Sequence, residues 1–376
     1  MKKLTDICDI QYGYAFDSKY FTEDPAYPPL VRIRDVKRGY SETYYSGDYP
    51  QEYVLKSGDL LIGMDGEFNI ARWKSDGALL NQRVCKLTVK KGTNEEYLRF
   101  AMSKALKKIE QKTAFVTVKH LSAKELNKLQ LYVPDLSEQN KVAEILSRLE
   151  VIIDVRRKEV EKLDELIKAR FVEMFGDPIE NPMCWPVKPL KEMSTLITNG
   201  NTPKGGSENY VESGIIFLRS QNVWRNRIEL DDVAYIDEKT HNKMKKSSLH
   251  YKDILITKTG RINTENSSLG RAALYLGEDD QANINGHVYL VRLDSSIVPE
   301  FVVTILTGEA YRKYIRKVCV GGIDKRQINV DQVESFPIIL PSIELQKEFV
   351  NFRTQIDKSK YDAMYVDINV LEYRCE

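Results

Sequence analysis

Histidine and cysteine, the residues that most often ligate metals or act as nucleophiles, are scattered through this sequence. The four histidines, at positions 120, 241, 250 and 287, stand at no metal-ligand spacing from one another or from a cysteine. The five cysteines are odd in number and never form a Cys-x-x-Cys pair. We therefore predict no metal site and no disulfide framework, and we expect reduced thiols.

Three segments come close to catalytic motifs, and each lacks a feature that the chemistry needs. The segment 200–207 has the glycine spacing of a phosphate loop, but Gly206 stands where the phosphate-binding lysine must be. The segment 24–29 resembles the Asp-Pro-Pro-Tyr loop of amino-methyltransferases, but Ala26 interrupts it. Acidic residues near 135–141 hint at a nuclease cluster but are better explained as a helix cap and first turn. The sequence predicts a binding protein without catalytic residues.

Polar side chains able to recognise nucleic-acid bases follow an apolar segment in the second half of the chain. Arg pairs well with guanine, and Gln or Asn with adenine, in the major groove of DNA, although such side chains also tie down loops. The candidates here are Arg219, Ser220, Gln221 and Asn222. Upstream, the glycines of the loop 199–209 allow close backbone approach to a phosphate, unless this is an ordinary surface turn. Its candidate contacts are Asn201, Thr202 and Lys204.

Further basic and amide side chains lie in loops that suit DNA-backbone contact or groove insertion. In the second half these are Lys258, Arg261, Asn263, Lys325 and Arg326. In the first half the corresponding candidates are Gln11, Tyr12, Tyr14, Lys19, Arg32, Arg34, Asn69, Arg72 and Arg83. Charge on an exposed loop is usually just solvated, so this remains the competing interpretation for each of them.

The chain contains an internal repeat with a period near half its length. The segment 30–36, Leu-Val-Arg-Ile-Arg-Asp-Val, matches 217–223, Phe-Leu-Arg-Ser-Gln-Asn-Val, and further landmarks follow in the same order. The offset grows slowly, from 187 residues between Arg32 and Arg219 to 207 between Pro134 and Pro341. This pattern indicates a duplication with loop insertions.

Each copy ends in a helix signal. After Pro134, apolar residues alternate at steps of four and three with Arg156 at one position, as in a coiled-coil seam: Val142, Leu146, Leu149, Ile153, Val160, Leu163 and Ile167. The spacing predicts a helix over about 138–173, ~54 Å long at 1.5 Å per residue. A similar stripe from Phe349 to Tyr373 predicts a second one. We expect the two to pair antiparallel, the alternative being that each packs on its own domain.

Composition limits the class of protein. With 376 residues, 42% apolar and 30% charged, the chain is long enough for two or three folded units. The net charge of +1 lowers the expectation of nucleic-acid binding unless the basic residues are segregated on one face. The N-terminus lacks an apolar signal segment and no apolar run is long enough for a membrane, so we expect a cytoplasmic protein with no membrane contact. Short strands mixed with helices such as 95–111 predict an α+β fold.

Several segments together resemble the DNA-specificity subunits of type I restriction-modification systems. The resemblance rests on Thr202-Pro203, 217–223, 253–260 and Leu340-Pro341 with the following 344–346, and on the central segment 171–178, Phe-Val-Glu-Met-Phe-Gly-Asp-Pro. It covers essentially the whole chain, including its duplication. The first half departs more, because Asp65-Gly66 stands in place of the Lys258-Thr259-Gly260 turn.

The resemblance implies two target-recognition domains, each reading one part of a bipartite double-stranded DNA site. They would span 1–135 and 183–342, with a central helical spacer at 136–182 and a C-terminal helical region at 343–376. Such helices act as a ruler and dock two adenine methyltransferase subunits, which restriction subunits with a nuclease and a motor then join. The chain itself would carry no cofactor, with S-adenosylmethionine, ATP and Mg²⁺ on the partner subunits. A coiled-coil scaffold that binds only protein, or a degenerate methyltransferase or nuclease fragment, are the alternatives.

Overall fold

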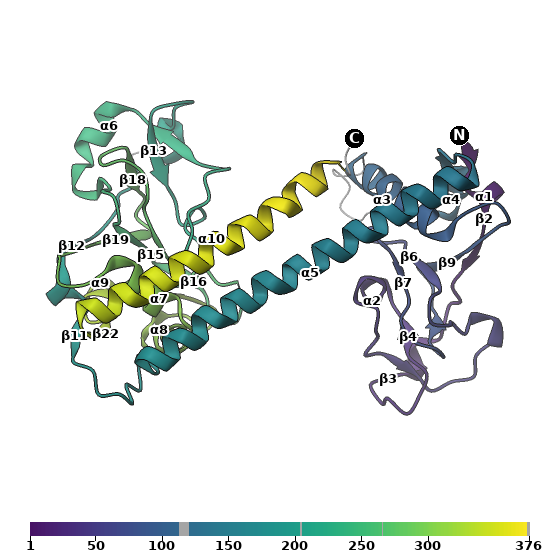
Figure 1. The fold of residues 1–376 in the computed structure, drawn as a ribbon, viewed down its shortest axis with the longest axis horizontal. Helices are drawn as coiled ribbons and strands as arrows, with labels where there is room; N and C mark the ends of the chain where they lie inside the picture. The colour runs from purple at the N-terminus through teal and green to yellow at the C-terminus, as the bar shows by residue number, and fades with distance from the viewer. Residues whose placement is uncertain (113–119, 204, 265, 374–376) are drawn as a thin grey trace. The chain divides into compact units, whose positions relative to one another are not determined.

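The computed structural model describes residues 1–112, 120–203, 205–264 and 266–373 (Figure 1). The chain divides into two compact units, Met1–Val155 (unit 1) and Arg156–Glu376 (unit 2). Both units combine antiparallel sheets with helices, which confirms the α+β class. The finer division into two recognition domains and two helical regions stays a prediction.

Unit 1 is built around a four-stranded antiparallel sheet. Its strand order is β2 (Cys8–Tyr12), β9 (Val84–Val89), β6 (Leu60–Gly63) and β7 (Ile70–Arg72). The apolar run of β6 is buried throughout, as expected of a strand covered on both faces. One face packs against α3 (Glu95–Lys112), which confirms the helix predicted at 95–111, with Leu98, Met102 and Leu106 in the shared core.

Shorter elements complete unit 1. The pairs are β1 (Lys2–Lys3) with β10 (Gln130–Leu131), β3 (Phe21–Thr22) with β5 (Tyr44–Tyr45), and β4 (Leu30–Val31) with β8 (Leu79–Leu80), of which only the last is parallel. The short helices are α1 (Leu4–Ile7), α2 (Ile33–Arg38) and α4 (Ala123–Lys128).

Unit 2 repeats this plan. Its four-stranded antiparallel sheet has the order β12 (Ser194–Asn199), β19 (Val288–Leu293), β15 (Ile254–Thr257) and β17 (Ala272–Leu274). The three-stranded sheet β14 (Ala234–Ile236), β13 (Ile215–Leu218), β18 (Ala282–Ile284) contains a parallel pair, β13 with β18, like that of unit 1. The remaining strands are β16 (Thr259–Arg261), β20 (Val320–Gly321), β21 (Lys325–Gln327), and the pair β11 (Val187–Pro189) and β22 (Pro337–Ile339). The short helices are α6 (Glu238–Lys243), α7 (Pro299–Thr307), α8 (Glu309–Val318) and α9 (Val330–Glu334).

The repeat extends to individual hydrogen bonds. Asp59 accepts one from the backbone of Lys56 at 2.9 Å, and Asp253 accepts one from the backbone of His250 at 2.7 Å. Each of these carboxylates directly precedes an inner strand of its sheet, β6 or β15, and pairs with a cation of the other inner strand, Lys86 of β9 or Arg292 of β19. The two copies therefore share a fold, as the sequence repeat predicts.

Two long helices carry the seams. α5 (Leu136–Phe175) begins in unit 1 and ends in unit 2, and α10 (Ile343–Tyr373) ends the described chain. Within unit 2 they run antiparallel, because Asp164 pairs with Lys360 at 2.6 Å while the later Arg170 pairs with the earlier Glu348 at 3.0 Å. The predicted seam residues of α5 are buried or half-buried. In the part of the chain that the structure describes, no helix combines the length and apolar character needed to cross a membrane.

Candidate nucleic-acid interface

Parallel pairing in unit 2 brings two loops together. Strands β13 and β18 run side by side, with Leu218 opposite Ile284, and the backbone N–H of Asn285 donates to the carbonyl oxygen of Leu218 at 3.0 Å. The segment that starts at Arg219 therefore lies next to the turn between β18 and β19. Side chains from both loops share one edge of the unit.

A glycine contact adds a third loop to this edge. The N–H of Gly200 donates to the carbonyl of Val288 at 3.1 Å, and a Cβ at Gly200 would lie 1.9 Å from the carbonyl oxygen of Ile284. No side chain fits at this distance, so position 200 requires glycine. The exposed Asn201 and Thr202 follow directly, while the predicted Lys204 lies outside the described residues.

A basic strand pair approaches the same edge. The N–H of Lys258 donates to the carbonyl of His287, a residue of the β18–β19 turn, at 2.8 Å. Beyond it, β16 pairs with β21, which sets Arg261 opposite Lys325. The side chain of Arg326 on β21 donates a hydrogen bond to the carbonyl oxygen of Gly322, within the same hairpin. The exposed Asn263 lies in the turn after β16. The structure thus gathers most of the predicted residues of unit 2 around one loop cluster.

Within the segment 219–222 the side chains divide into two kinds. Asn222 is 2% exposed; its Oδ1 accepts from the N–H of Arg219, and its Nδ2 donates to the carbonyls of Glu229 and Asp232. These bonds make Asn222 the side chain that closes the turn, and its contact with a base stays a prediction. Gln221 is exposed, and Asp232 accepts hydrogen bonds from both Gln221 and Arg219. Ser220, half-buried between them, makes the turn itself.

Unit 1 repeats the arrangement with shorter loops. The N–H of Gly13 donates to the carbonyl of Val84 at 2.9 Å, and the N–H of Tyr14 donates to the carbonyl of Leu80. A Cβ at Gly13 would lie 2.0 Å from the carbonyl oxygen of Asn81. Asp35 accepts from the N–H of Arg32 as Asn222 does from Arg219, and is 1% exposed. Arg32 and Arg34 are exposed on this loop.

Several predicted residues of unit 1 are engaged in ties within the unit. Arg72 donates to Glu95, Glu96 and the carbonyl of Gly58 at 2.6 to 2.8 Å, so its guanidinium joins β7 to α3. Burial opposes its charge, but these carboxylates outweigh burial and raise the pKa of Arg72. Arg72 is held by these partners in the free chain, and its DNA contact stays a prediction.

The other predicted residues of unit 1 also have partners. Tyr12 donates to Ala123 and Asn127 of the α4 region, Gln11 to the carbonyl of Glu52, and Asn69 to that of Glu67. Lys19 pairs with Asp17 at 3.0 Å, both exposed, and the exposed Arg83 pairs with the half-buried Asp65 at 3.6 Å. Tyr14 stacks edge-on against Phe16 while remaining partly exposed. Among these, Lys19, Arg83 and Tyr14 keep surface that a ligand can reach.

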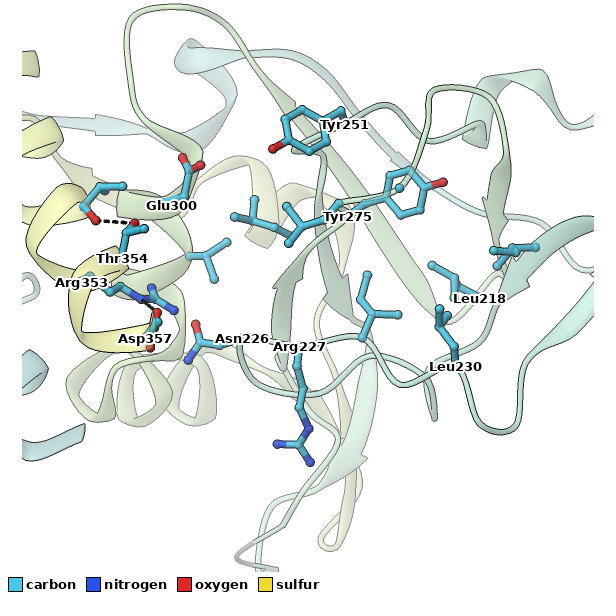
Figure 2. A pocket seen from close by; sticks show the side chains of 17 residues that line it. Leu218, Asn226, Arg227, Leu230, Tyr251, Tyr275, Glu300, Arg353, Thr354 and Asp357 are labelled. Atoms are coloured by element: carbon cyan, nitrogen blue, oxygen red, sulfur yellow. Dashed lines mark hydrogen bonds and ion pairs between the residues drawn. The ribbon is translucent and has the colours of Figure 1, made fainter. Parts of the chain in front are cut away.

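A pocket of about 710 Å³ lies elsewhere in unit 2, among β17, α7 and α10 (Figure 2). The exposed apolar side chains of Leu230, Tyr251 and Leu276 line it, and α10 contributes Arg353 and Asp357. None of the sequence-predicted residues belongs to it. Sequence reasoning also missed Trp224 and its arginine neighbours, for which the run Trp-Arg-Asn-Arg at 224–227 was the available signal.

The family model for the type I restriction modification DNA specificity domain matches residues 1–165 and 182–372, which correspond to the two copies described above. The chain belongs to this family. Relatives of this specificity-domain protein include the type I restriction enzyme EcoBI specificity subunit of Escherichia coli, 29% identical over 92% of this chain and 77% of the relative. The MjaVIII specificity subunit of Methanocaldococcus jannaschii is 23% identical over 82% of this chain and 74% of its own length.

Two solved structures have the same fold as this specificity-domain protein. The S subunit of a type I restriction-modification system from M. genitalium has a TM-score of 0.57 at 14% identity, covering 99% of this chain and 93% of its own. A chain from a structure of type I system assembly and conformational transition has a TM-score of 0.53 at 16% identity, with 99% and 94% covered. At sequence identities this low, the structural similarity shows a shared fold and nothing more.

Proposed function

We propose that this chain reads a bipartite DNA target for a type I restriction-modification complex, with one loop cluster for each half-site and no catalytic residues of its own. The observation that carries the proposal is the duplication: each unit holds the same strand arrangement, and in each a glycine, Gly13 or Gly200, brings loops to one edge. A protein with two copies of one binding scaffold suits two separated groove segments on duplex DNA.

The loop cluster of unit 2 offers both classes of DNA contact. Lys258, Lys325 and the exposed amide and hydroxyl of 201–202 suit phosphate oxygens, which position a protein without specifying sequence. Arg219 and Gln221 suit base edges, because the arginine offers two parallel N–H donors and the glutamine amide offers one donor group and one acceptor. In the free chain Asp232 holds these two side chains, so base readout requires them to exchange that carboxylate for a base.

The proposal assigns the chemistry to partner subunits. Two adenine methyltransferase subunits would dock on the helical regions, and restriction subunits would join them, with S-adenosylmethionine, ATP and Mg²⁺ bound there. Exposed apolar side chains on α5 support such docking, since solvated helix faces seldom carry so many. They are Leu136, Ile145, Val151, Ile152, Val155, Leu166 and Val172.

Exchange of one recognition domain tests the proposal. Residues 183–342 are replaced by the matching segment of another specificity-domain protein, and methylated sites are mapped in cells that also hold the methyltransferase subunit. We expect one half of the target to change and the other to persist. A folded chimera that loses both halves together, or a wild-type chain whose removal leaves genomic methylation unchanged, would contradict the proposal.

A further inference from the structure

Three polar side chains of unit 1 form a cluster of hydrogen bonds and ion pairs. Asp65 contacts the other two, because its Oδ2 lies 3.6 Å from Nε of Arg83 and its Oδ1 pairs with Nδ1 of His120. Nη1 of Arg83 lies 3.1 and 3.2 Å from the two ring nitrogens of His120. A carboxylate only accepts hydrogen bonds and a guanidinium only donates them. Nδ1 of the ring therefore donates to Asp65, and Nε2 is left to accept from Arg83.

The cluster lies at the loop edge of unit 1. Arg83 ends the turn between β8 and β9, and the N–H of Gln82 in this turn donates to the carbonyl of Tyr14 at 2.8 Å. Tyr14 directly follows Gly13, the glycine that brings the loops of this edge together. The side chains of Arg83 and His120 are 52% and 43% exposed, so a ligand bound at this edge can reach both.

The backbone arrangement around Arg83 recurs in unit 2 with a different side chain. The N–H of Met64 donates to the carbonyl of Arg83 at 2.9 Å, and the N–H of Lys258 donates to that of His287 at 2.8 Å. His287 ends the turn between β18 and β19, as Arg83 ends the turn between β8 and β9. The position that holds a guanidinium in unit 1 therefore holds an imidazole in unit 2.

The two supporting positions differ between the units as well. A β-bridge sets Asp65 opposite His120, and the pairing of β16 with β21 sets Thr259 opposite Gln327. Threonine is uncharged, so unit 2 has no carboxylate at the position equivalent to Asp65. The two units thus present different hydrogen-bonding groups from equivalent positions, as readers of two unlike half-sites require.

The backbone of Arg83 gives an independent indication of function. Its φ is 70°, in the left-handed region that glycine adopts readily and that costs other residues stability. The ion pair with Asp65 is partly exposed and offsets little of this cost. Folding alone would favour glycine at this turn position. Residues held in such conformations cluster at functional sites.

The charges of the cluster favour a base over a phosphate as the ligand of Arg83. Asp65 balances the charge of Arg83, and its carboxylate would repel a phosphate placed beside it. A base edge is uncharged and is recognised by the direction of hydrogen bonds. Within the described residues, the partners of the guanidinium engage Nε and Nη1, which leaves Nη2 and the second hydrogen of Nη1 to donate as a pair. Such a pair matches the O6 and N7 acceptors of guanine.

We propose that Arg83 reads a guanine in the half-site of unit 1, and that Asp65 and His120 are positioning residues that orient its guanidinium. The inference rests on the proposed function and gives one half-site a base contact with two supporting residues. Because Asp65 and His120 hold the guanidinium before DNA binds, Arg83 loses less side-chain freedom on binding.

The test compares variants of the cluster in the full-length chain bound to its methyltransferase subunit. Arg83→Gly removes the guanidinium at a position whose φ suits glycine, and Arg83→Lys keeps the charge without the paired donors. Asp65→Ala removes the support, and Asp65→Asn restores an acceptor for His120 without the charge. Lys90→Gln is the control, because Lys90 pairs with Asp9 at 3.2 Å at the opposite end of β9. Thermal denaturation verifies that each variant folds.

Each complex is titrated at several salt concentrations with duplexes that vary one base pair at a time. The varied positions are those of the half-site that persists when residues 183–342 are exchanged. We expect Arg83→Gly and Arg83→Lys to lower the preference for guanine at one position about tenfold, while affinity for random DNA and the salt slope keep their wild-type values. Asp65→Ala and His120→Ala should lower that preference about threefold. Asp65→Asn and His120→Gln, which keep hydrogen-bonding groups, should recover most of it, and the control should match the wild type.

Several outcomes would contradict the inference. An intact guanine preference in both Arg83 variants would overturn it. So would an equal loss from Arg83→Gly on every duplex with a salt slope lowered by about 0.9, which would make Arg83 a phosphate contact. Wild-type preferences in both Asp65→Ala and His120→Ala would exclude these two as positioning residues. A wild-type complex that prefers no bipartite site would instead contradict the proposed function.

Discussion

Gln139 and Gln346 make the same hydrogen bonds in the two copies of the fold. The Oε1 of Gln139 accepts from the N–H of Asn94, and that of Gln346 from the N–H of Val298, both at 2.9 Å. Each Nε2 donates to the carbonyl of the proline that precedes its long helix, Pro134 or Pro341, again at 2.9 Å. Both glutamines are 1% exposed, so each joins the start of a long helix to the segment before a helix of the core.

Replacing Gln346 should therefore destabilise unit 2. In Gln346→Ala the N–H of Val298 and the carbonyl of Pro341 lose their partner in a buried place, which costs roughly 1–3 kcal/mol for each unsatisfied group. Equilibrium denaturation in urea measures the loss, with Gln355→Ala at an exposed position of α10 as control. Equal midpoints for both variants would show that water replaces the glutamine at no cost.

Adjacent residues in the turn after β13 should behave differently. Gln221→Ala should relax discrimination at one base pair by roughly 1–3 kcal/mol and leave the melting temperature unchanged, because the side chain is exposed. Asn222→Ala should lower the melting temperature, because the turn loses its buried hydrogen bonds. Binding to a panel of single-substitution duplexes together with thermal denaturation separates the two effects. Uniform loss of affinity from Gln221→Ala on every duplex would exclude it as a base-reading residue.

Lengthening α5 should lengthen the preferred gap between half-sites. Asp164 pairs with Lys360, so an insertion is better placed before this contact, by repeating residues 151–154 after Asp154. Four residues add ~6 Å and overshoot one helical turn by only ~40°, so the seam stays nearly in phase. DNA rises ~3.4 Å per base pair, so the gap should grow by one or two pairs.

A two-residue insertion at the same place serves as the control. It rotates the following seam by ~200° and should damage folding or partner docking more than it changes the gap. Methylation mapping measures the outcome for both variants. If the four-residue variant methylates sites with the original gap, α5 does not set the spacing.

The buried thiols should be unreactive in the folded chain. Burial raises the pKa of both Cys8 and Cys85 to about 12, so these thiols stay protonated near neutral pH, while Cys184 is exposed. The folded-state pKa exceeds the ordinary value near 9.0, so the stability they contribute is complete below pH 9 and is lost as the pH rises towards 12.

In a Cys375→Ser background, iodoacetamide at about pH 8 should modify Cys184 and spare Cys8 and Cys85 until the chain is denatured. Peptide mass analysis identifies the modified positions. Rapid alkylation of Cys85 in the folded chain would contradict its burial.

The long helix and the repeat were predictable because their signals are regular. The seam from Val142 to Ile167 predicted a helix at 138–173, and α5 spans Leu136–Phe175, because a sustained four-three spacing is incompatible with strands. Matching landmarks in the two halves likewise predicted equivalent folds, and Asp35 and Asn222 occupy equivalent turns although their residue types differ.

The roles of individual polar residues were less predictable. Gln221 and Asn222 are neighbours of similar chemistry, and only the folded turn determines that Asn222 is buried while Gln221 is exposed. Arg72 has the residue type of a phosphate contact, but its carboxylate partners lie more than twenty positions away at Glu95 and Glu96. Arg271 lies over the ring of Trp224, a long-range contact for which the sequence around Arg271 gives no signal.

The unbroken helix α5 has a mechanical consequence. Between Leu136 and Phe175 it contains neither glycine nor proline, the residues at which helices most often kink. It therefore has no built-in hinge and should behave as an elastic rod, in which any strain imposed at one end is spread over many turns. The rod ends at Gly176, whose positive φ of 73° turns the chain out of the helix.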